Sequence, residues 1–232
     1  HLNYVAPRRM GVLDPIKMVI TNYPEDKVEW MEATNNPEDP SEGKREIPFC
    51  NELYIDRADF MVDPPKKFYR MAPGRDARLM SGYIVRCEDY DLDDDGKVSK
   101  IYATYYPSSK SGEDTSGLKP KATLHWVSAK HAKTAELRLY DRLFKEPHPT
   151  GDKEVDYVEH FNEDSLHILK NSKVEPALAD AEVGERYQFM RKGYYTLDRE
   201  STDDHLIFNR TVTMRDTWKK VMKQRKQQKK KG

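Results

Sequence analysis

The chain has 232 residues, of which 37% are apolar and 34% charged, and its 40 basic residues balance its 40 acidic ones. This length suits one large domain or two small ones, and no apolar run approaches the length of a membrane span, which argues against a membrane or secreted protein. Cys50 and Cys87 have no metal-binding spacing, and so few cysteines are typical of a reduced, cytoplasmic protein. Because the chain begins at His1 rather than Met, we expect an excised fragment.

The basic charge is unevenly distributed. Lys219–Gly232 contains eight Lys or Arg residues and no acidic residue, so residues 1–218 hold 32 basic against 40 acidic side chains. An acidic body binds nucleic acid only where its cations converge locally. The tail has no apolar periodicity, and we expect it to be disordered.

Short segments rich in β-branched and aromatic residues follow one another along the chain. They are Lys17–Tyr23, Glu52–Phe60, two strands within Arg78–Tyr106, Lys121–Ala129 and Ala135–Phe144, followed by Asp164–Lys173, Arg186–Asp198 and Leu206–Trp218. We expect tight turns at the sequence DLDDDG, which begins at Asp91, and at Arg191–Gly193. The stretch Glu146–Lys153 breaks the pattern and is the best candidate for a domain boundary. With few helical signals, the sequence predicts a mainly β chain, in two antiparallel barrels.

Two patterns resemble metal sites but lack the residues that would complete them. Asp91–Gly96 matches the first half of a calcium-binding loop, yet the twelfth position is Tyr102 instead of Glu, and the flanks are strands. His125 and His131 have no further zinc ligands at a useful spacing. We therefore interpret the first pattern as a hairpin turn and the histidines as structural, and we predict no metal site.

The sequence also offers no catalytic centre. Lys97–Lys100 (KVSK) resembles a lysine loop that contacts ATP phosphates, but it directly follows a predicted hairpin turn and lacks the histidine motif that would accompany it. A glycine-rich phosphate loop, a nucleophile elbow and paired carboxylates are all missing. We expect this chain to be non-catalytic and to bind no cofactor itself.

Three stretches combine Arg, Lys, Gln or Asn with aromatic residues. They are Asn3–Arg9, Lys66–Arg78 and Arg186–Arg191. Single-stranded RNA is read by stacking bases on aromatic or arginine planes and by hydrogen bonds to their edges. The alternative is a solvated charged surface, and composition leaves both interpretations open.

Several blocks carry a resemblance to a known family. They are residues 6–25, 44–60, 121–132 (KATLHWVSAKHA), 135–144, 174–198 and 208–218 (FNRTVTMRDTW). In this order they resemble the C-terminal half of bacterial glutaminyl-tRNA synthetases, which contains the anticodon-binding region. The resemblance covers nearly all of residues 6–218.

This resemblance implies two closed, antiparallel, six-stranded β-barrels similar to ribosomal protein L25, with exchanged N-terminal strand elements. The first barrel would span residues 1–144 and the second 145–205, while residues 206–218 would return to the first barrel ahead of the tail at 219–232. The parent would be a glutamine–tRNA ligase, a monomer that charges tRNA(Gln) with ATP and Mg²⁺ bound in a catalytic domain absent from this chain.

The family's anticodon-contacting motifs fall on particular residues. They are Arg8, Lys67, Tyr69, Arg70, Arg78, Gln188 and Arg191. The resemblance implies that Arg8, Gln188 and Arg191 contact the middle base, a uracil. Lys67 and Arg70 match residues that contact the third base, a guanine, whose two acceptors suit an arginine fork.

Some positions depart from the family pattern. Arg78 matches a residue that contacts the first base, but the next basic position of the family is Met80 here, which weakens first-base reading. Tyr69 stands where some members have Lys. We expect Asn3 to cap the pocket around Arg8.

Two other assignments remain open. The chain could be the equivalent region of a glutamyl-tRNA synthetase that shares these barrels, or a stand-alone L25-like protein that binds ribosomal RNA. The anticodon preference of the full-length protein distinguishes a glutaminyl- from a glutamyl-tRNA synthetase. An open reading frame that continues upstream of His1 would exclude a stand-alone protein.

Overall fold

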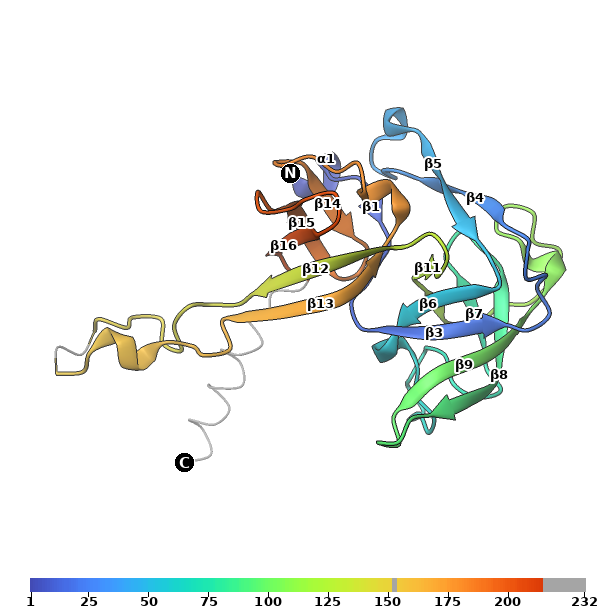
Figure 1. Cartoon of the computed structure of the whole chain (residues 1–232), viewed down its shortest axis with the longest axis horizontal. Coiled ribbons are helices and arrows are strands. Elements are labelled where there is room, and N and C mark those ends of the chain that lie inside the picture. Colours follow the sequence, from blue (N-terminus) through green and yellow to red (C-terminus); the bar gives the residue numbers. More distant parts are fainter. Residues whose placement is uncertain (152–153, 215–232) are drawn as a thin grey trace.

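The structure is a computed structural model that describes residues 1–151 and 154–214. Almost all of its regular structure is β-strand (Figure 1), so the predicted mainly β class is confirmed. No helix within the described residues is long and apolar enough to cross a membrane. The predicted tail Lys219–Gly232 and the end of the strand predicted over Leu206–Trp218 lie outside the described residues.

Seven strands of the described chain form the first sheet, in the order β10-β7-β8-β9-β3-β6-β11. They are β3 (Pro15–Ile20), β6 (Glu52–Asp56), β7 (Asp76–Leu79), β8 (Ile84–Leu92), β9 (Val98–Tyr105), β10 (Thr123–Leu124) and β11 (Trp126–Ser128). The two edge strands, β10 and β11, are consecutive in the chain and only His125 separates them. The sheet therefore curls into a nearly closed barrel.

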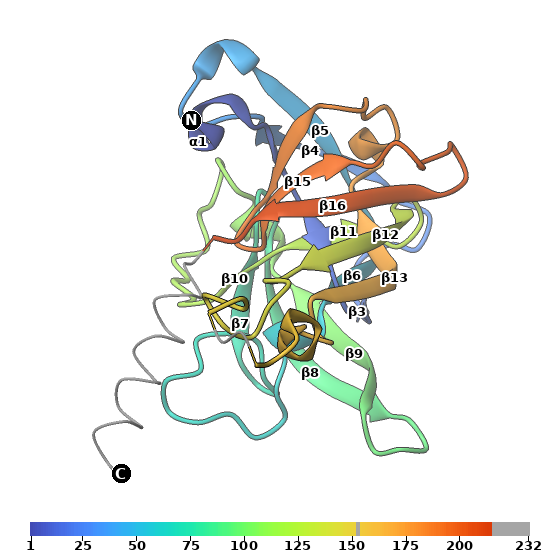
Figure 2. The same ribbon diagram turned by 90° about the vertical axis from the view of Figure 1, so that its left-hand side faces the viewer.

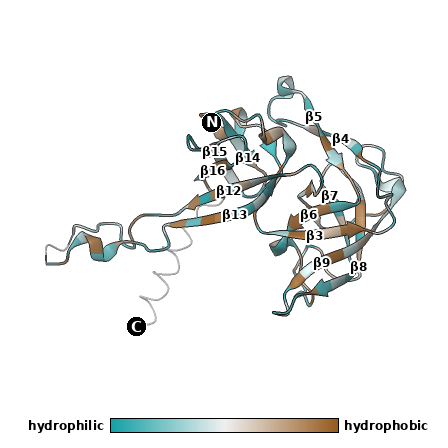
Figure 3. Ribbon diagram, viewed as in Figure 1, coloured by the Kyte–Doolittle hydropathy of each residue, from teal (hydrophilic) through white to brown (hydrophobic). Residues whose placement is uncertain are grey.

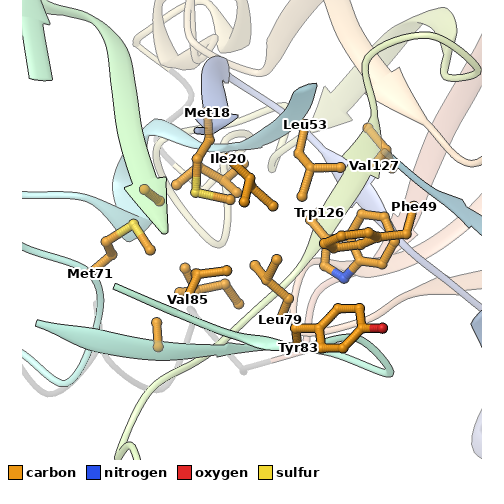
Figure 4. Packing of buried hydrophobic residues seen from close by; sticks show 14 of the residues in the cluster. Met18, Ile20, Phe49, Leu53, Met71, Leu79, Tyr83, Val85, Trp126 and Val127 are labelled. Carbon is orange, nitrogen blue, oxygen red and sulfur yellow. The ribbon is translucent and has the colours of Figure 1, made fainter. Parts of the chain in front are cut away.

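Side chains that alternate along the strands fill this barrel, as Met18 and Ile20 do on β3. Trp126 is fully buried and Phe49 packs edge-on against it, with 5.2 Å between ring centroids (Figure 4). The indole Nε1 donates a hydrogen bond to the carbonyl oxygen of Met80 at 2.8 Å, so no polar atom of Trp126 is buried without a partner. This core holds β7, which carries the predicted site residue Arg78. The loop before β7 carries Lys67, Tyr69 and Arg70.

Seven further strands of the described chain form the second sheet, in the order β1-β14-β15-β16-β12-β13-β2. They are β1 (Arg8–Arg9), β2 (Gly11–Val12), β12 (Lys133–Tyr140), β13 (Leu166–Val174), β14 (Arg186–Phe189), β15 (Gly193–Leu197) and β16 (Leu206–Val212). Its core is smaller and centres on Phe189, which stacks on Tyr195 with ring centroids 4.3 Å apart and also contacts Phe208.

The remaining elements are short. β4 (Glu29–Thr34) and β5 (Lys44–Phe49) form a separate hairpin, of which the sequence analysis missed both strands. The helical turns are α1 (Leu2–Val5) and the 3-10 turns η1 (Pro40–Glu42), η2 (Arg57–Asp59), η3 (Pro107–Ser109), η4 (Tyr157–His160) and η5 (Pro176–Leu178).

The predicted hairpin at DLDDDG is confirmed. β8 and β9 flank it, and Asp93 Oδ1 accepts hydrogen bonds from the backbone N–H groups of Asp95 at 3.1 Å and Lys97 at 2.8 Å. Gly96 has a φ of +73°, the left-handed conformation that the turn requires.

The prediction of two antiparallel, six-stranded barrels is wrong in its strand number and strand directions, because each of the two sheets of the described chain has seven strands. Both sheets are mixed, because β1 runs parallel to β14, β12 to β16, β10 to β7 and β3 to β9. Each of these strands is separated from its parallel partner by other strands along the chain, and such a connection lets a strand enter the sheet in the same direction as its neighbour. Hairpin signals reveal only antiparallel neighbours.

The N-terminal segment links the two sheets. β1 and β2 belong to the second sheet, and β3 belongs to the first. Glu175, directly after β13, fixes this passage. Its buried Oε1 accepts a hydrogen bond from the Met10 backbone N–H at 2.5 Å, and its carboxylate pairs with the guanidinium of Arg45 at 2.6 Å.

β12 and β13 pair with each other on either side of the predicted boundary Glu146–Lys153. Their far ends project from the molecule as an arm (Figure 1), which points toward the viewer in Figure 2. Leu143 and Tyr157, near the end of the arm, are exposed, and part of the arm is coloured as hydrophobic in Figure 3. β16 lies between β12 and β15. The division of the chain at residue 144 stays a prediction.

Candidate nucleic-acid interface

Arg8 lies on β1 directly opposite Gln188 on β14, although 180 positions separate them in the sequence. The Arg8 side chain is buried, and its guanidinium donates hydrogen bonds to the carbonyl oxygens of Ala6 at 2.7 Å and Asn3 at 2.8 Å. A third hydrogen bond reaches the side-chain Oδ1 of Asn3 at 2.9 Å. The expected contact between Asn3 and Arg8 is therefore present.

Gln188 belongs to the same hydrogen-bonded group. Its Nε2 donates to the hydroxyl of Tyr194 on β15 at 2.7 Å, and both side chains are buried. The Tyr194 hydroxyl also lies 3.5 Å from Asn3 Oδ1. Two predicted site residues, Arg8 and Gln188, are thus held close together by neighbours from both ends of the chain.

Arg191 lies at the turn between β14 and β15, as predicted. Its φ of +66° is left-handed, its side chain is exposed, and its Nη1 donates a hydrogen bond to the carbonyl oxygen of Thr123 on β10. The next residue, Lys192, pairs with Asp56 at the end of β6, with 2.7 Å between Nζ and Oδ2. The turn of the second sheet is therefore attached to the first barrel at two points.

Lys67, Tyr69 and Arg70 lie in the loop that leads to β7. Lys67 and Tyr69 are exposed, and the Nζ of Lys121 lies 5.8 Å from the centroid of the Tyr69 ring. Arg70 forms an ion pair with the buried carboxylate of Asp59. An open groove of about 370 Å³ runs past this loop. Its lining consists of Lys66, Phe68, Tyr69, Arg70, Gly74, Arg75, Asp76, Arg86, Pro120, Lys121 and Ala122.

Arg78 is held differently from the other predicted site residues. Its Nη1 donates a hydrogen bond to the carbonyl oxygen of Ser109 at 2.5 Å, and its Nη2 pairs with Asp114. The guanidinium is thus occupied by the loop that follows β9. Met80, the departure from the family pattern, lines a small cavity of about 180 Å³ together with Arg8.

A larger groove of about 800 Å³ brings together Arg70, from the loop before β7, and Arg191, from the β14–β15 turn. Its lining consists of Arg70, Tyr140, Asp141, Arg142, His167, Arg191, Lys192, Arg210, Thr213 and Met214. Among the described residues, the lining carries five Arg or Lys side chains and one carboxylate. Two of these cations, Arg70 and Lys192, are also paired with Asp59 and Asp56. An anionic ligand is favoured here, although residues 1–218 carry more acidic than basic groups. Neither Arg8 nor Gln188 lines this groove.

The sequence analysis missed Arg142, Lys192 and Arg210 as groove residues. Each lies inside a block that resembles the family, but their common groove depends on how the end of β12, the β14–β15 turn and β16 are arranged in the second sheet. Only the β-sheet order brings them together.

His125 lies at the junction of β10 and β11. Its burial lowers the pKa of the imidazole to about 3, and the nearby cations Arg191 and Lys192 add to this effect. Its Nε2 is buried with no hydrogen-bond partner among the described residues. His125 is therefore a neutral side chain that supports the strand from which Thr123 accepts the Arg191 hydrogen bond.

Comparison with known proteins identifies the family of the chain. Two family models, both described as the anticodon-binding domain of class I tRNA synthetases (E and Q), match residues 6–106 and 123–198. The chain belongs to this family of anticodon-binding domains.

Several glutamine–tRNA ligases are similar to the chain. The chain is 56% identical to a glutamine–tRNA ligase of Rhodopirellula baltica, over 95% of the chain and 37% of that protein. It is 48% identical to that of Nitrobacter hamburgensis and 45% identical to that of Cronobacter sakazakii, each over 95% of the chain and 39% of the relative. The predicted resemblance to the anticodon-binding region of glutaminyl-tRNA synthetases is confirmed, and the chain spans less than half the length of these relatives.

Proposed function

We propose that the chain reads the anticodon of tRNA(Gln) on behalf of a glutamine–tRNA ligase to which it belongs. The observation that carries this proposal is the meeting of Arg8 and Gln188 across β1 and β14, with Arg191 at the end of the same hairpin. Family membership gives the class of ligand, and the arrangement of these three side chains supports a specific role for each.

The middle base, a uracil, presents two carbonyl acceptors and one N–H donor. The Gln188 amide supplies both a donor and an acceptor, and Arg8 and Arg191 supply charge-assisted donors. Before RNA binds, Gln188 donates to Tyr194 and Arg8 donates to Asn3. Binding of uracil exchanges some of these internal hydrogen bonds for hydrogen bonds to the base, so little polar surface has to be stripped of water.

The third base, a guanine, is read in this proposal by Lys67 and Arg70. Tyr69, an exposed ring beside them, offers a flat surface on which a base stacks. For the first base, Arg78 must leave its contacts with Ser109 and Asp114. Met80 offers no hydrogen bond to the first base. Strict reading of that base is unnecessary, because glutamine anticodons begin with either pyrimidine.

The remainder of the proposal concerns the whole protein. The chain itself is non-catalytic, and a separate catalytic part binds ATP with Mg²⁺ and attaches glutamine to the tRNA in the cytoplasm. We also propose that the two sheets correspond to L25-like barrels with exchanged N-terminal strands, in a monomer. The passage of residues 8–20 from the second sheet to the first supports the exchange.

The experiment is a binding comparison with the full 232-residue chain. Its dissociation constants are measured by fluorescence anisotropy for tRNA(Gln) transcripts with each of the four middle bases, at one fixed salt concentration. We expect uracil to be preferred by about 10- to 100-fold, the range of a base-edge contact. Equal binding of all four transcripts would refute the proposal.

A further inference from the structure

Arg210 lies on β16 beside the turn that carries Arg191. A Cβ atom added to Gly193 would come within 3.0 Å of Arg210 Cδ and 3.2 Å of its Cγ. The aliphatic part of Arg210 therefore packs directly over this glycine, whose φ of +149° and close approach to the Val212 carbonyl oxygen leave no room for a side chain. This packing holds the Arg210 guanidinium in the large groove.

Neither arginine has a carboxylate partner in the part of the chain that the structure describes. Within residues 1–151 and 154–214, neither Arg191 nor Arg210 forms an ion pair. The Nε of Arg210 is moreover buried without a hydrogen-bond partner among the described residues. Two other arginines with limited exposure are neutralised, Arg45 by Glu175 at 2.6 Å and Arg138 by Glu136 at 2.8 Å. The buried Arg8 instead donates its hydrogen bonds to Ala6 and Asn3.

Like charges in one groove repel each other, and a buried donor without a partner costs free energy. An anion between Arg191 and Arg210 relieves the repulsion between their charges. The groove continues toward the base of the arm through Arg142 and His167, and Asp141 is the one carboxylate that the described residues contribute to its lining. The positive charge thus extends beyond the residues that match the family's base-reading motifs.

We propose that Arg210 and Arg142 bind backbone phosphates of the RNA strand whose middle anticodon base reaches Arg191. This inference rests on the proposed function. A phosphodiester offers oxygen acceptors that match the arginine fork, and each nucleotide carries one negative charge. Phosphate contacts set the position of the strand without reading its sequence, and Arg191 and Gln188 then select the base.

The test measures the salt dependence of binding to the four tRNA(Gln) transcripts by the full chain. Arg210→Gln removes one phosphate contact, so we expect the slope of log K against log salt concentration to fall in magnitude by about 0.7, the value for a single-stranded contact. Affinity is expected to fall by the same factor for all four transcripts, which leaves the preference for uracil unchanged. Arg142→Gln is expected to do the same.

Arg199→Gln is the matched control, since it removes the same charge from the exposed loop at the other end of the β15–β16 hairpin. It should leave both slope and preference unaltered. Arg210→Lys keeps the charge and should restore most of the slope. An unchanged slope in a folded Arg210→Gln variant, or in Arg142→Gln if the former unfolds, overturns the inference. Failure of the unmodified chain to prefer uracil refutes the proposed function instead.

Discussion

Lys192 Nζ lies 2.7 Å from Asp56 Oδ2, and this ion pair attaches the β14–β15 turn of the second sheet to the end of β6 in the first barrel. Both side chains are largely buried, with exposed fractions of 17% and 5%. Asp56 also accepts hydrogen bonds from the backbone N–H groups of Leu13 at 3.1 Å and Ala58 at 3.3 Å. Because Arg191 is the neighbour of Lys192, the pair fixes the position of a proposed base-reading side chain.

Lys192→Met should lower the free energy of unfolding by about 2–3 kcal/mol, because it leaves a buried carboxylate without its cation. It should also weaken the preference for uracil, since the turn that carries Arg191 loses one of its two attachments. Urea unfolding and transcript binding measure the two effects. Lys17→Met is the control, because the Lys17–Glu52 pair is about one-third exposed and its loss should cost less than about 1 kcal/mol. Equal effects of the two substitutions would contradict this account.

Tyr194→Phe tests whether the Gln188 amide is oriented from within the protein. The substitution removes the hydroxyl that accepts the Gln188 Nε2 hydrogen bond, and we expect a loss of about 0.5–1.5 kcal/mol in the free energy of unfolding. The preference for uracil should fall as well, because the amide is free to rotate. Tyr54→Phe removes a hydroxyl for which the described residues provide no hydrogen bond, and should change neither quantity. An unaltered preference in Tyr194→Phe would show that Gln188 needs no orienting partner.

The buried His125 makes stability depend on pH. Its folded-state pKa of about 3 lies below the ordinary value of 6.5, so the folded state favours the neutral imidazole and the unfolded state takes up the proton first. The contribution of His125 to the free energy of unfolding is therefore complete above pH 6.5. It is lost as the pH falls toward 3, by at most about 1.4 kcal/mol per pH unit. Between pH 6.5 and 5 most carboxylates remain ionised, which isolates the contribution of this histidine.

The measurement is urea unfolding at pH 7, 6 and 5. The variant His125→Gln should show a smaller loss of stability on acidification than the unmodified chain, even though its stability at pH 7 is lower. His148→Gln, which changes an exposed loop histidine, should keep the original slope. Parallel pH profiles for the unmodified chain and His125→Gln would mean that His125 takes up its proton without cost.

Many of the strands could be predicted from the sequence, because strands and tight turns leave local residue patterns. The turn at Arg191–Gly193 was predicted from a strand that ends in Arg-Lys-Gly, and the hairpin at DLDDDG from its aspartates and glycine. The β4–β5 hairpin was missed because Glu29–Thr34 has weak strand propensity of its own and is stabilised by pairing with Lys44–Phe49.

The candidate site could be predicted from the sequence only in part. The family resemblance singled out Arg8, Gln188 and Arg191, but sequence spacing could not show that Arg8 and Gln188 face each other across a parallel pair. Nor could it show that Lys192 pairs with Asp56, 136 positions away. Such contacts depend on the order of strands in the sheets, which the local pattern of polar and apolar residues does not encode.

The most direct test of the central claim is Arg191→Ala in the glutamine–tRNA ligase that we propose contains this chain. Charging efficiency, kcat/KM, is measured on tRNA(Gln) and on a variant with a changed middle base. We expect the ratio of the two efficiencies to fall by about 10- to 100-fold, or about 1–3 kcal/mol of lost discrimination, while the exposed turn keeps its fold. If the substitution lowers both efficiencies equally, or neither, Arg191 does not read the middle base and the account is wrong.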